Sequence, residues 1–221
     1  QYAWWQYVVL AVAAFFFWSL FFTMTAYRAP GDKRLDVYFV GTGVPEDTLT
    51  WFQDQILSLY EDSVEDSSCL AIVNTDENYY GAMQMTTYMA AGEGDIYLLP
   101  AEEFEQMKDS GGFAPLDAAI ADGTIDLRGI DVSSAVVYDE QGTPSTVAIP
   151  TESLYGLMDL GIDNRDAYLC VMITSQNQQT AFSFVNWIIE NMLAEKPQWL
   201  VEQEERASSQ ADFTPSDIAS Y

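Results

Sequence analysis

Carboxylates are the side chains that this sequence offers most often for chemistry, because its 221 residues include 34 acidic residues, 8 basic residues and no histidine. Pairs such as Glu102 with Glu103, or Asp62 with Glu65, could act as the acid and base of a glycosidase. That reaction needs one carboxyl group with a raised pKa across a substrate cleft from the other, and carboxylates this frequent do not indicate such a pair. The absence of histidine excludes the Ser–His and Cys–His nucleophile systems and most catalytic zinc sites. We therefore expect a protein that is not an enzyme; an acidic surface hydrolase is the least favoured alternative.

Two short motifs begin like known ligand-binding loops and then depart from them. Gly41-Thr42-Gly43 follows a predicted strand, as in a dinucleotide-binding fingerprint, but Glu46 stands where the third glycine would be. Residues 74–85 begin with the alternating side chains of an EF-hand loop, but they lack its central glycine and its closing glutamate. Cys69 and Cys170 fall within predicted strands, where buried free thiols are the default. The net charge of −26 repels phosphate backbones, so we expect no nucleic acid partner. Because both motifs depart from their patterns and the chain has no histidine and two cysteines, we also expect no cofactor and no metal site.

Polar and glycine residues that directly follow predicted strands are better candidates for a binding site. In open α/β sheets, ligands bind outside the carboxyl ends of the strands, close to the amino ends of helices. The candidates at the ends of the first three predicted strands are Gly41, Thr42, Gly43, Thr75, Asp76 and Glu102. Ordinary turn chemistry is the competing interpretation, because the same residue types are common in turns that bind nothing.

The elements that would position these residues are strands and helices in alternation. Apolar, β-branched and aromatic runs predict strands, and apolar residues at helical spacing predict a helix after each strand. The predicted strands are 35–40, 69–74 and 95–99, and the predicted helices are 44–60, 78–91 and 100–108. Three such pairs with short connections indicate parallel βαβ units.

A different pattern follows in the second half of the chain. Residues 135–138 and 146–149 predict a hairpin with a longer loop, and residues 168–173 predict another buried strand. Ser175 to Gln178 forms an S-x-x-Q sequence, which predicts a capping box at the start of a helix that ends near Lys196-Pro197.

The segment from Trp4 to Tyr27 has no charged residue and predicts a membrane-spanning helix. A cleaved signal peptide is the alternative, although its apolar core is usually only about 7 to 15 residues long. Arg28, Lys33 and Arg34 follow the segment, and the positive-inside rule taken alone would place the rest of the chain in the cytoplasm. Because the chain begins at Gln1 rather than at a methionine, we expect a flank that this sequence does not contain. Charge alone therefore leaves the orientation open.

Three motifs occur in an order that points to a known family. Gly94–Asp117 consists of a predicted strand and helix and then the turn Gly112-Phe113-Ala114-Pro115-Leu116. Ala148-Ile149-Pro150-Thr151 is similar to a hinge strand of the form Y-A-I-P, and Ala181–Ile189 fits A-x-x-F-[IV]-N-W-[LI]. Together these motifs resemble the extracellular solute-binding proteins of bacterial ABC transporters, of the periplasmic-binding-protein-like type II.

The resemblance implies an α/β fold: a single lobe of that type, with a mostly parallel sheet flanked by helices, preceded by one N-terminal transmembrane helix. In the family, the chain builds a second lobe after the hinge strand. Here only the residues Thr151–Ala167 separate the hinge strand from the next strand, too few for a lobe. The hinge position adds Thr151 and Glu152 to the ligand-binding candidates.

The predicted organisation has four parts, namely an anchor at 1–28, a linker at 29–34, the lobe at 35–200 and a polar tail at 201–221. By resemblance, we expect a single-pass protein of the cell membrane with its soluble domain outside the cytoplasm. Its expected partners are the lipid bilayer, a small-molecule solute, and an ABC transporter permease or another envelope protein. The alternative is a structural or interaction subunit that binds no ligand and packs against another membrane protein.

Overall fold

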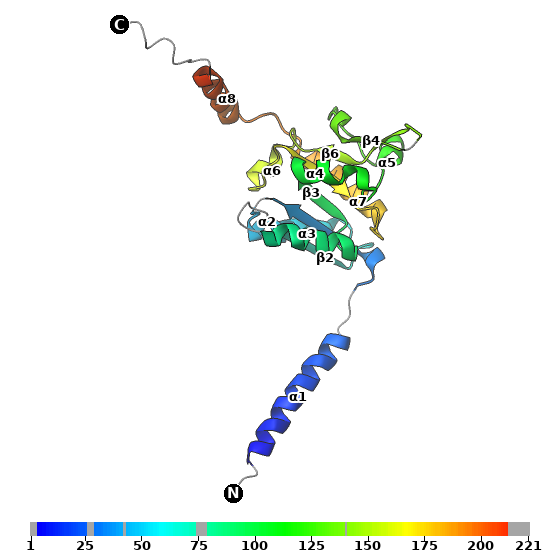
Figure 1. Ribbon diagram of the computed structural model, residues 1–221, viewed down its shortest axis with the longest axis vertical. Helices are drawn as coiled ribbons and strands as arrows, with labels where there is room; N and C mark the ends of the chain where they lie inside the picture. The colour runs from blue at the N-terminus through cyan, green and yellow to red at the C-terminus, as the bar shows by residue number, and fades with distance from the viewer. Residues whose placement is uncertain (1–3, 26–28, 42, 74–78, 140, 212–221) are drawn as a thin grey trace, which may run out of the picture. The chain divides into compact units, whose positions relative to one another are not determined.

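The computed structural model describes residues 4–25, 29–41, 43–73, 79–139 and 141–211. The chain forms two compact units, Gln1–Pro30 and Gly31–Tyr221, which are described separately. The first unit contains helix α1 (Trp4–Thr25), whose 22 residues include no acidic or basic side chain (Figure 1). Its segment Trp4–Phe22 is long and apolar enough to cross a membrane, and none of it is buried.

The second unit is built on a five-stranded sheet with the order β2-β1-β3-β7-β6. Its strands are β1 (Arg34–Val40), β2 (Asp66–Ile72), β3 (Ile96–Pro100), β6 (Ala148–Pro150) and β7 (Ala167–Val171). Strand β1 is parallel to β2 and to β3, whereas β7 is antiparallel to both β3 and β6. Four strands therefore run in one direction and β7 runs against them, which confirms the predicted mixed α/β fold with a mostly parallel sheet.

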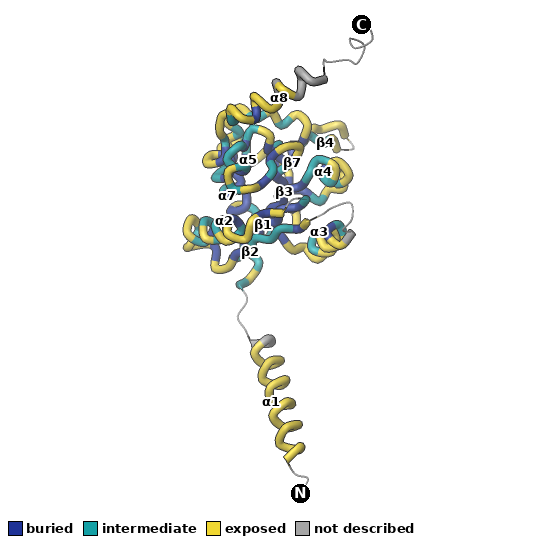
Figure 2. Tube along the Cα trace, turned by 90° about the vertical axis from the view of Figure 1, so that its left-hand side faces the viewer, coloured by how far each residue is buried: buried dark blue, intermediate teal, exposed yellow. Residues whose placement is uncertain are grey.

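Helices cover both faces of this sheet because successive residues of a strand point to opposite faces. Val37 and Phe39 of β1 pack with α2 (Glu46–Leu59) and α7 (Gln178–Met192) on one face. Tyr38 and Val40 pack on the other face, with α3 (Tyr79–Ala91) and α4 (Ala101–Met107). Figure 2 shows the two helix layers with the buried strands between them.

Shorter elements complete the second unit. A two-stranded sheet joins β4 (Val136–Tyr138) and β5 (Pro144–Thr146), and the remaining helices are α5 (Asp117–Ala121), α6 (Gly156–Asp159) and α8 (Gln198–Ala211). Among the residues that the structure describes, 3-10 helices lie at Gly31–Lys33, Lys108–Ser110 and Ser133–Ala135. The two cysteines are free and lie on β2 and β7, with β1 and β3 between those strands.

The second strand of the predicted hairpin is divided between two sheets. Thr146 ends β5 and pairs with Val136, whereas Ala148 begins β6 and pairs with Cys170 in the large sheet. Val147 lies between them, and its amide N–H donates to the carbonyl of Ala135 at 3.0 Å. The residues 146–149 thus read as one extended run in the sequence, although their hydrogen bonds go to different partners.

The predicted capping box at Ser175 is wrong. Ser175 Oγ donates to Asp95 Oδ1 at 2.6 Å, and the residue before α7 is Asn177, which makes no side-chain capping bond. The Ser175 oxygen accepts from the N–H of Asn177 at 3.2 Å, two residues later, and α7 begins only at Gln178. Ser175 therefore lies in the turn before the helix and does not cap it.

The beginning of the predicted polar tail is helical. Helix α8 extends to Ala211, because Leu200 buries its side chain and Glu202 pairs with Arg206 one turn later at 3.0 Å. At the other end of the unit, the predicted linker 29–34 includes the 3-10 turn Gly31–Lys33, and Arg34 already belongs to β1.

Candidate functional site at the carboxyl edge of the sheet

The register of the sheet brings the ends of β3 and β6 to either side of the start of β7. Pro100 pairs with Ala167, and Pro150 pairs with Tyr168. The next amides continue the pattern, since Ala101 N–H donates to Asp166 at 2.7 Å and Thr151 N–H donates to Ala167 at 3.0 Å. Glu102 and the predicted hinge residues Thr151 and Glu152 therefore follow strands that end at the same edge of the sheet.

Gly41 joins β1 to this edge and must be a glycine. Its φ is +94°, and a Cβ atom at this position would lie 2.4 Å from Cγ of Pro100. Its N–H donates to Ile72 at 3.0 Å, which keeps the end of β1 beside β2. A side chain would be strained in this conformation and would collide with the Pro100 ring. Gly43 is exposed, and the predicted candidates Thr42, Thr75 and Asp76 lie outside the described residues.

Thr151 is a buried structural residue rather than an exposed ligand contact. Its side chain is fully buried, and Oγ1 lies 2.9 Å from the carbonyl oxygen of Asn164 and 3.0 Å from that of Ala167. Asn164 also bonds to this segment through its side chain, because its Nδ2 donates to the carbonyl oxygens of Thr151 at 3.0 Å and Glu152 at 2.9 Å. Sequence reasoning missed Asn164, since an asparagine in a polar turn carries no local signal for a buried role.

Asn164 also carries an unsatisfied acceptor. Its Oδ1 atom is buried and has no hydrogen-bond partner among the described residues. A buried polar atom of this kind is usually bonded to a protein group or to an ordered water molecule. Because its amide nitrogen holds the backbone of Thr151 and Glu152, Asn164 fixes the path of the chain as it leaves β6.

The connection between β6 and β7 packs on the amino end of α2 instead of building a second lobe. Thr48 Oγ1 donates to the carbonyl of Leu160 at 2.8 Å, and a Cβ atom on Gly161 would lie 3.1 Å from Cγ of Pro45. Three side chains of the connection belong to the core below α2, namely Leu154, Leu157 and Ile162. In the part of the chain that the structure describes, one lobe alone borders this edge.

Exposed carboxylates dominate the charge at this edge. The side chains of Glu102 and Glu152 are exposed, and the one cation in the turn before β7 is Arg165, whose NH2 lies 2.8 Å from Asp163. That pairing holds the pKa of Asp163 below its ordinary value, so both groups stay charged and cancel each other. Chemically, the edge offers acceptors for sugar hydroxyl groups or for an ammonium group, and it disfavours anions.

A second carboxylate cluster, which the sequence did not reveal, lies at the opposite edge of the sheet. Asp36 N–H donates to Asp95 Oδ2 at 2.8 Å, and Asp95 N–H donates to the carbonyl of Asp36 at 2.9 Å. Asp36 also accepts from Ser68 N–H at 3.0 Å and pairs with Arg34 at 2.7 Å. Burial raises the pKa of Asp36 to about 6 and also raises the pKa of Asp95. Because their oxygens are already bonded within the sheet, these carboxylates clamp β1, β2 and β3 together.

Comparison with known proteins gives partial matches of fold. No family profile matches the sequence, and no curated protein matches it. An extracellular solute-binding protein family 1 member from Alicyclobacillus acidocaldarius is 16% identical, with a TM-score of 0.40 over 56% of this chain and 29% of that one. An ABC substrate-binding protein from Listeria monocytogenes, solved with cycloalternan, is 17% identical, with a TM-score of 0.36 over 52% of this chain and 28% of that one.

A third structure is an ABC transporter solute-binding protein from Agrobacterium vitis with bound D-mannitol. It is 19% identical, with a TM-score of 0.35 over 53% of this chain and 27% of that one. The matches cover less than a third of the length of each of these three proteins. By their descriptions, these three structures are solute-binding proteins, the family that the sequence motifs also resemble.

Proposed function

We propose that this protein is a membrane-tethered, extracytoplasmic module, similar to a solute-binding protein, that recognises a small solute in connection with an ABC transporter. The observation that carries the proposal is the register at the carboxyl edge, where Gly41, Glu102 and the pair Thr151–Glu152 follow β1, β3 and β6, three strands that end at this edge. Thr42, Thr75 and Asp76 follow strand ends of the same edge in the sequence and belong to the proposed site. The charge of the edge favours a sugar, a polyol or an organic ammonium ion.

A structural role is the second candidate, and the short connection between β6 and β7 favours it. With one lobe, this chain would contact a solute at the carboxyl edge from one side only, and a partner protein would have to supply the surface on the other side. In that case the edge would contact another membrane protein and would bind no small molecule of its own.

A thermal-shift experiment on the full chain in detergent micelles separates the two candidates. We expect a member of a panel of neutral sugars, polyols and organic amines to raise the melting temperature as its concentration increases. A ligand at about 100 times its Kd adds about 2.7 kcal/mol to the unfolding free energy. The double variant Glu102→Gln/Glu152→Gln should lose the response. Glu61→Gln/Asp62→Asn, which changes two exposed carboxylates just after α2, at the other edge of the sheet, should keep it. No response, together with co-purification of a membrane protein, would support the structural role instead.

The proposed location predicts that a protease added to intact spheroplasts degrades the second unit. Helix α1 would keep the chain in the membrane, so the fragment that remains should be short and should stay in the membrane fraction. A cytoplasmic protein in the same cells serves as the control and should stay intact until lysis. Protection of residues 35–211 until lysis would contradict the extracytoplasmic location, and release of the whole protein from unlysed cells would contradict the anchor.

A further inference from the structure

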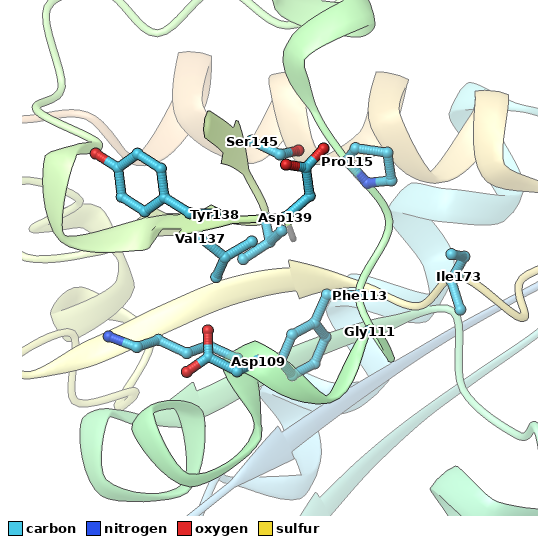
Figure 3. Close-up of a pocket in the computed structure, with 11 residues that line it drawn as sticks. Asp109, Gly111, Phe113, Pro115, Val137, Tyr138, Asp139, Ser145 and Ile173 are labelled. Atoms are coloured by element: carbon cyan, nitrogen blue, oxygen red, sulfur yellow. The ribbon is translucent and has the colours of Figure 1, made fainter. Parts of the chain in front are cut away.

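A cavity of about 320 Å³ lies on the side of the sheet opposite to the proposed solute edge. Its floor consists of Phe113 and Val147, which are 3% and 5% exposed, and the β4–β5 hairpin forms one wall. Figure 3 shows Val137 of the hairpin on the side towards Asp109 and Phe113, whereas the ring of Tyr138 points away from them. Val147 comes directly before β6, and Ile173 comes shortly after the end of the antiparallel strand β7, so both mark the amino edge. This cavity is therefore separate from Gly41, Glu102 and the hinge.

Exposed apolar surface continues beyond the cavity. The side chains of Tyr138 and Ile173 are 69% and 48% exposed, and both line the opening. Pro115 and Val137 extend the same surface between them. Contiguous exposed apolar surface with a polar rim is a feature of protein interaction sites. A small ligand would occupy the cavity and leave much of the Tyr138 ring in water, whereas a protein partner would cover both the cavity and the ring.

The rim of the cavity carries a net negative charge. Lys108 pairs with Glu105 at 2.6 Å and is neutralised by it. Asp139 accepts the backbone N–H groups of Gln141 at 2.9 Å and Thr143 at 2.8 Å, and the bonds to this turn hold its pKa below the ordinary value. Asp109 is the second exposed carboxylate at the opening. A partner group that matches this rim is a cation.

We propose that this cavity docks a basic segment of a protein partner, which inserts one leucine- or phenylalanine-sized side chain and places flanking lysine or arginine residues beside Asp109 and Asp139. The volume matches one large apolar side chain with room at the opening, and the charges match the flanking cations. Attraction to a chain of net charge −26 also speeds the encounter with a basic partner. The proposal does not depend on a solute at the carboxyl edge.

Fluorescence anisotropy with the full chain in uncharged detergent micelles tests this proposal. The probe is a labelled hexapeptide with leucine and phenylalanine between two pairs of lysines, and empty micelles correct for binding to detergent. Two control peptides replace either the apolar pair by glycine and serine or the four lysines by glutamates. We expect the probe to bind and both control peptides to bind at least about tenfold more weakly, because apolar burial and charge each contribute more than 1.4 kcal/mol.

Matched variants locate the binding on the protein. Ile173→Ser and Asp139→Asn should each weaken the probe by about fivefold or more. Leu59→Ser removes an apolar side chain of similar exposure on α2, and Asp131→Asn changes a carboxylate that accepts a backbone N–H in an exposed turn in the same way. Both of these variants should bind the probe like the natural chain.

Three results would overturn the proposal. The first is no probe binding up to millimolar concentration. The second is evidence that net charge alone attracts the probe. Asp131→Asn and Asp139→Asn would then weaken probe binding equally, or the glycine–serine peptide would bind as tightly as the probe. The third is that the peptide does not bind, whereas a free aromatic amine such as phenethylamine binds tightly and loses its binding in Ile173→Ser. The cavity would then be a site for a small molecule.

Discussion

Replacing Phe184 by alanine is expected to lower the free energy of unfolding of the second unit by about 3 to 5 kcal/mol. Phe184 lies on α7 and is fully buried. Its ring stacks on that of Trp187, with 5.3 Å between centroids, and meets the rings of Phe52 and Tyr60 edge-on at 6.4 and 6.3 Å. Phe39 of β1 extends the cluster through Phe52 at 5.2 Å. One substitution therefore removes contacts that join α7, α2 and the sheet.

Urea unfolding of the full chain in detergent, followed by near-ultraviolet circular dichroism, measures this loss. The effect should be large because surrounding rings cannot close a cavity of this size without losing their own contacts. Gln179→Ala on the same helix is the control, since that side chain is exposed and its loss should change the unfolding free energy by less than about 0.5 kcal/mol. A loss of under 1 kcal/mol for Phe184→Ala would contradict the packing of α2 and α7 on one face.

Much of this fold follows from local sequence patterns. The run 35–40 predicts a strand buried on both faces, and β1 covers Arg34–Val40 with residues 35–40 all buried. One apolar stripe at helical spacing predicts α7, and the structure buries all of its residues, namely Ala181, Val185, Ile188, Ile189 and Met192. Such patterns work because burial on one face of a helix, or on both faces of a parallel strand, imposes its own period on the sequence.

Features that depend on distant partners could not be predicted in this way. The direction of β7 is set by its pairing with β3 and β6, and its own residues would suit either direction. Ser175 matches a capping sequence, yet its hydroxyl bonds to Asp95, which lies 80 positions earlier. Nothing in the sequence distinguishes Asp36 and Asp95 from the other acidic residues, because their hydrogen bonds depend on the pairing of β1 with β3.

The candidate site also combines features that local sequence predicts with features that depend on distant partners. The glycine after β1 is recognisable from its position, and the structure gives its physical reason in the Pro100 ring. The predicted edge also contains Thr151 and Glu152, but Thr151 is buried and its hydroxyl is used within the chain. Asn164, which holds this turn, lies 12 and 13 positions from its partners Glu152 and Thr151. Sequence position indicates which residues reach the edge, and side-chain burial decides which of them can meet a ligand.

The buried pair Asp36–Asp95 predicts that the second unit becomes more stable as the pH falls from 8 to about 5. Burial raises the pKa of Asp36 from 3.8 to about 6, with the nearby charge of Asp95 adding to the shift and Arg34 opposing it. Between these two values the folded state holds a proton that the unfolded state has released. The stabilisation is therefore complete below about pH 4 and is lost as the pH rises through about 6, a change on the order of 2 kcal/mol.

The basic, tyrosine and thiol groups around Asp36 keep one protonation state between pH 5 and pH 8. Arg34 keeps its charge, and burial raises the pKa values of Tyr38 and Tyr97 above their ordinary value, so both stay neutral. Cys69 stays a thiol because burial raises its pKa to about 12. Unfolding free energies measured in urea at pH 8, 7, 6 and 5 should increase in that order.

Asp95→Asn tests whether this pair is the origin of the pH dependence. The asparagine oxygen can still accept from Asp36 N–H, and its amide can donate to Ser175 Oγ, so the hydrogen bonds of Asp95 are kept without its charge. The difference in unfolding free energy between pH 8 and pH 5 should therefore shrink, with the gain in stability at pH 8. Asp62→Asn makes the same charge change at an exposed position, and it should keep the slope of the natural chain. If both variants had the same pH profile, the slope would come from the relief of overall charge repulsion, because the two substitutions share nothing except the loss of one negative charge.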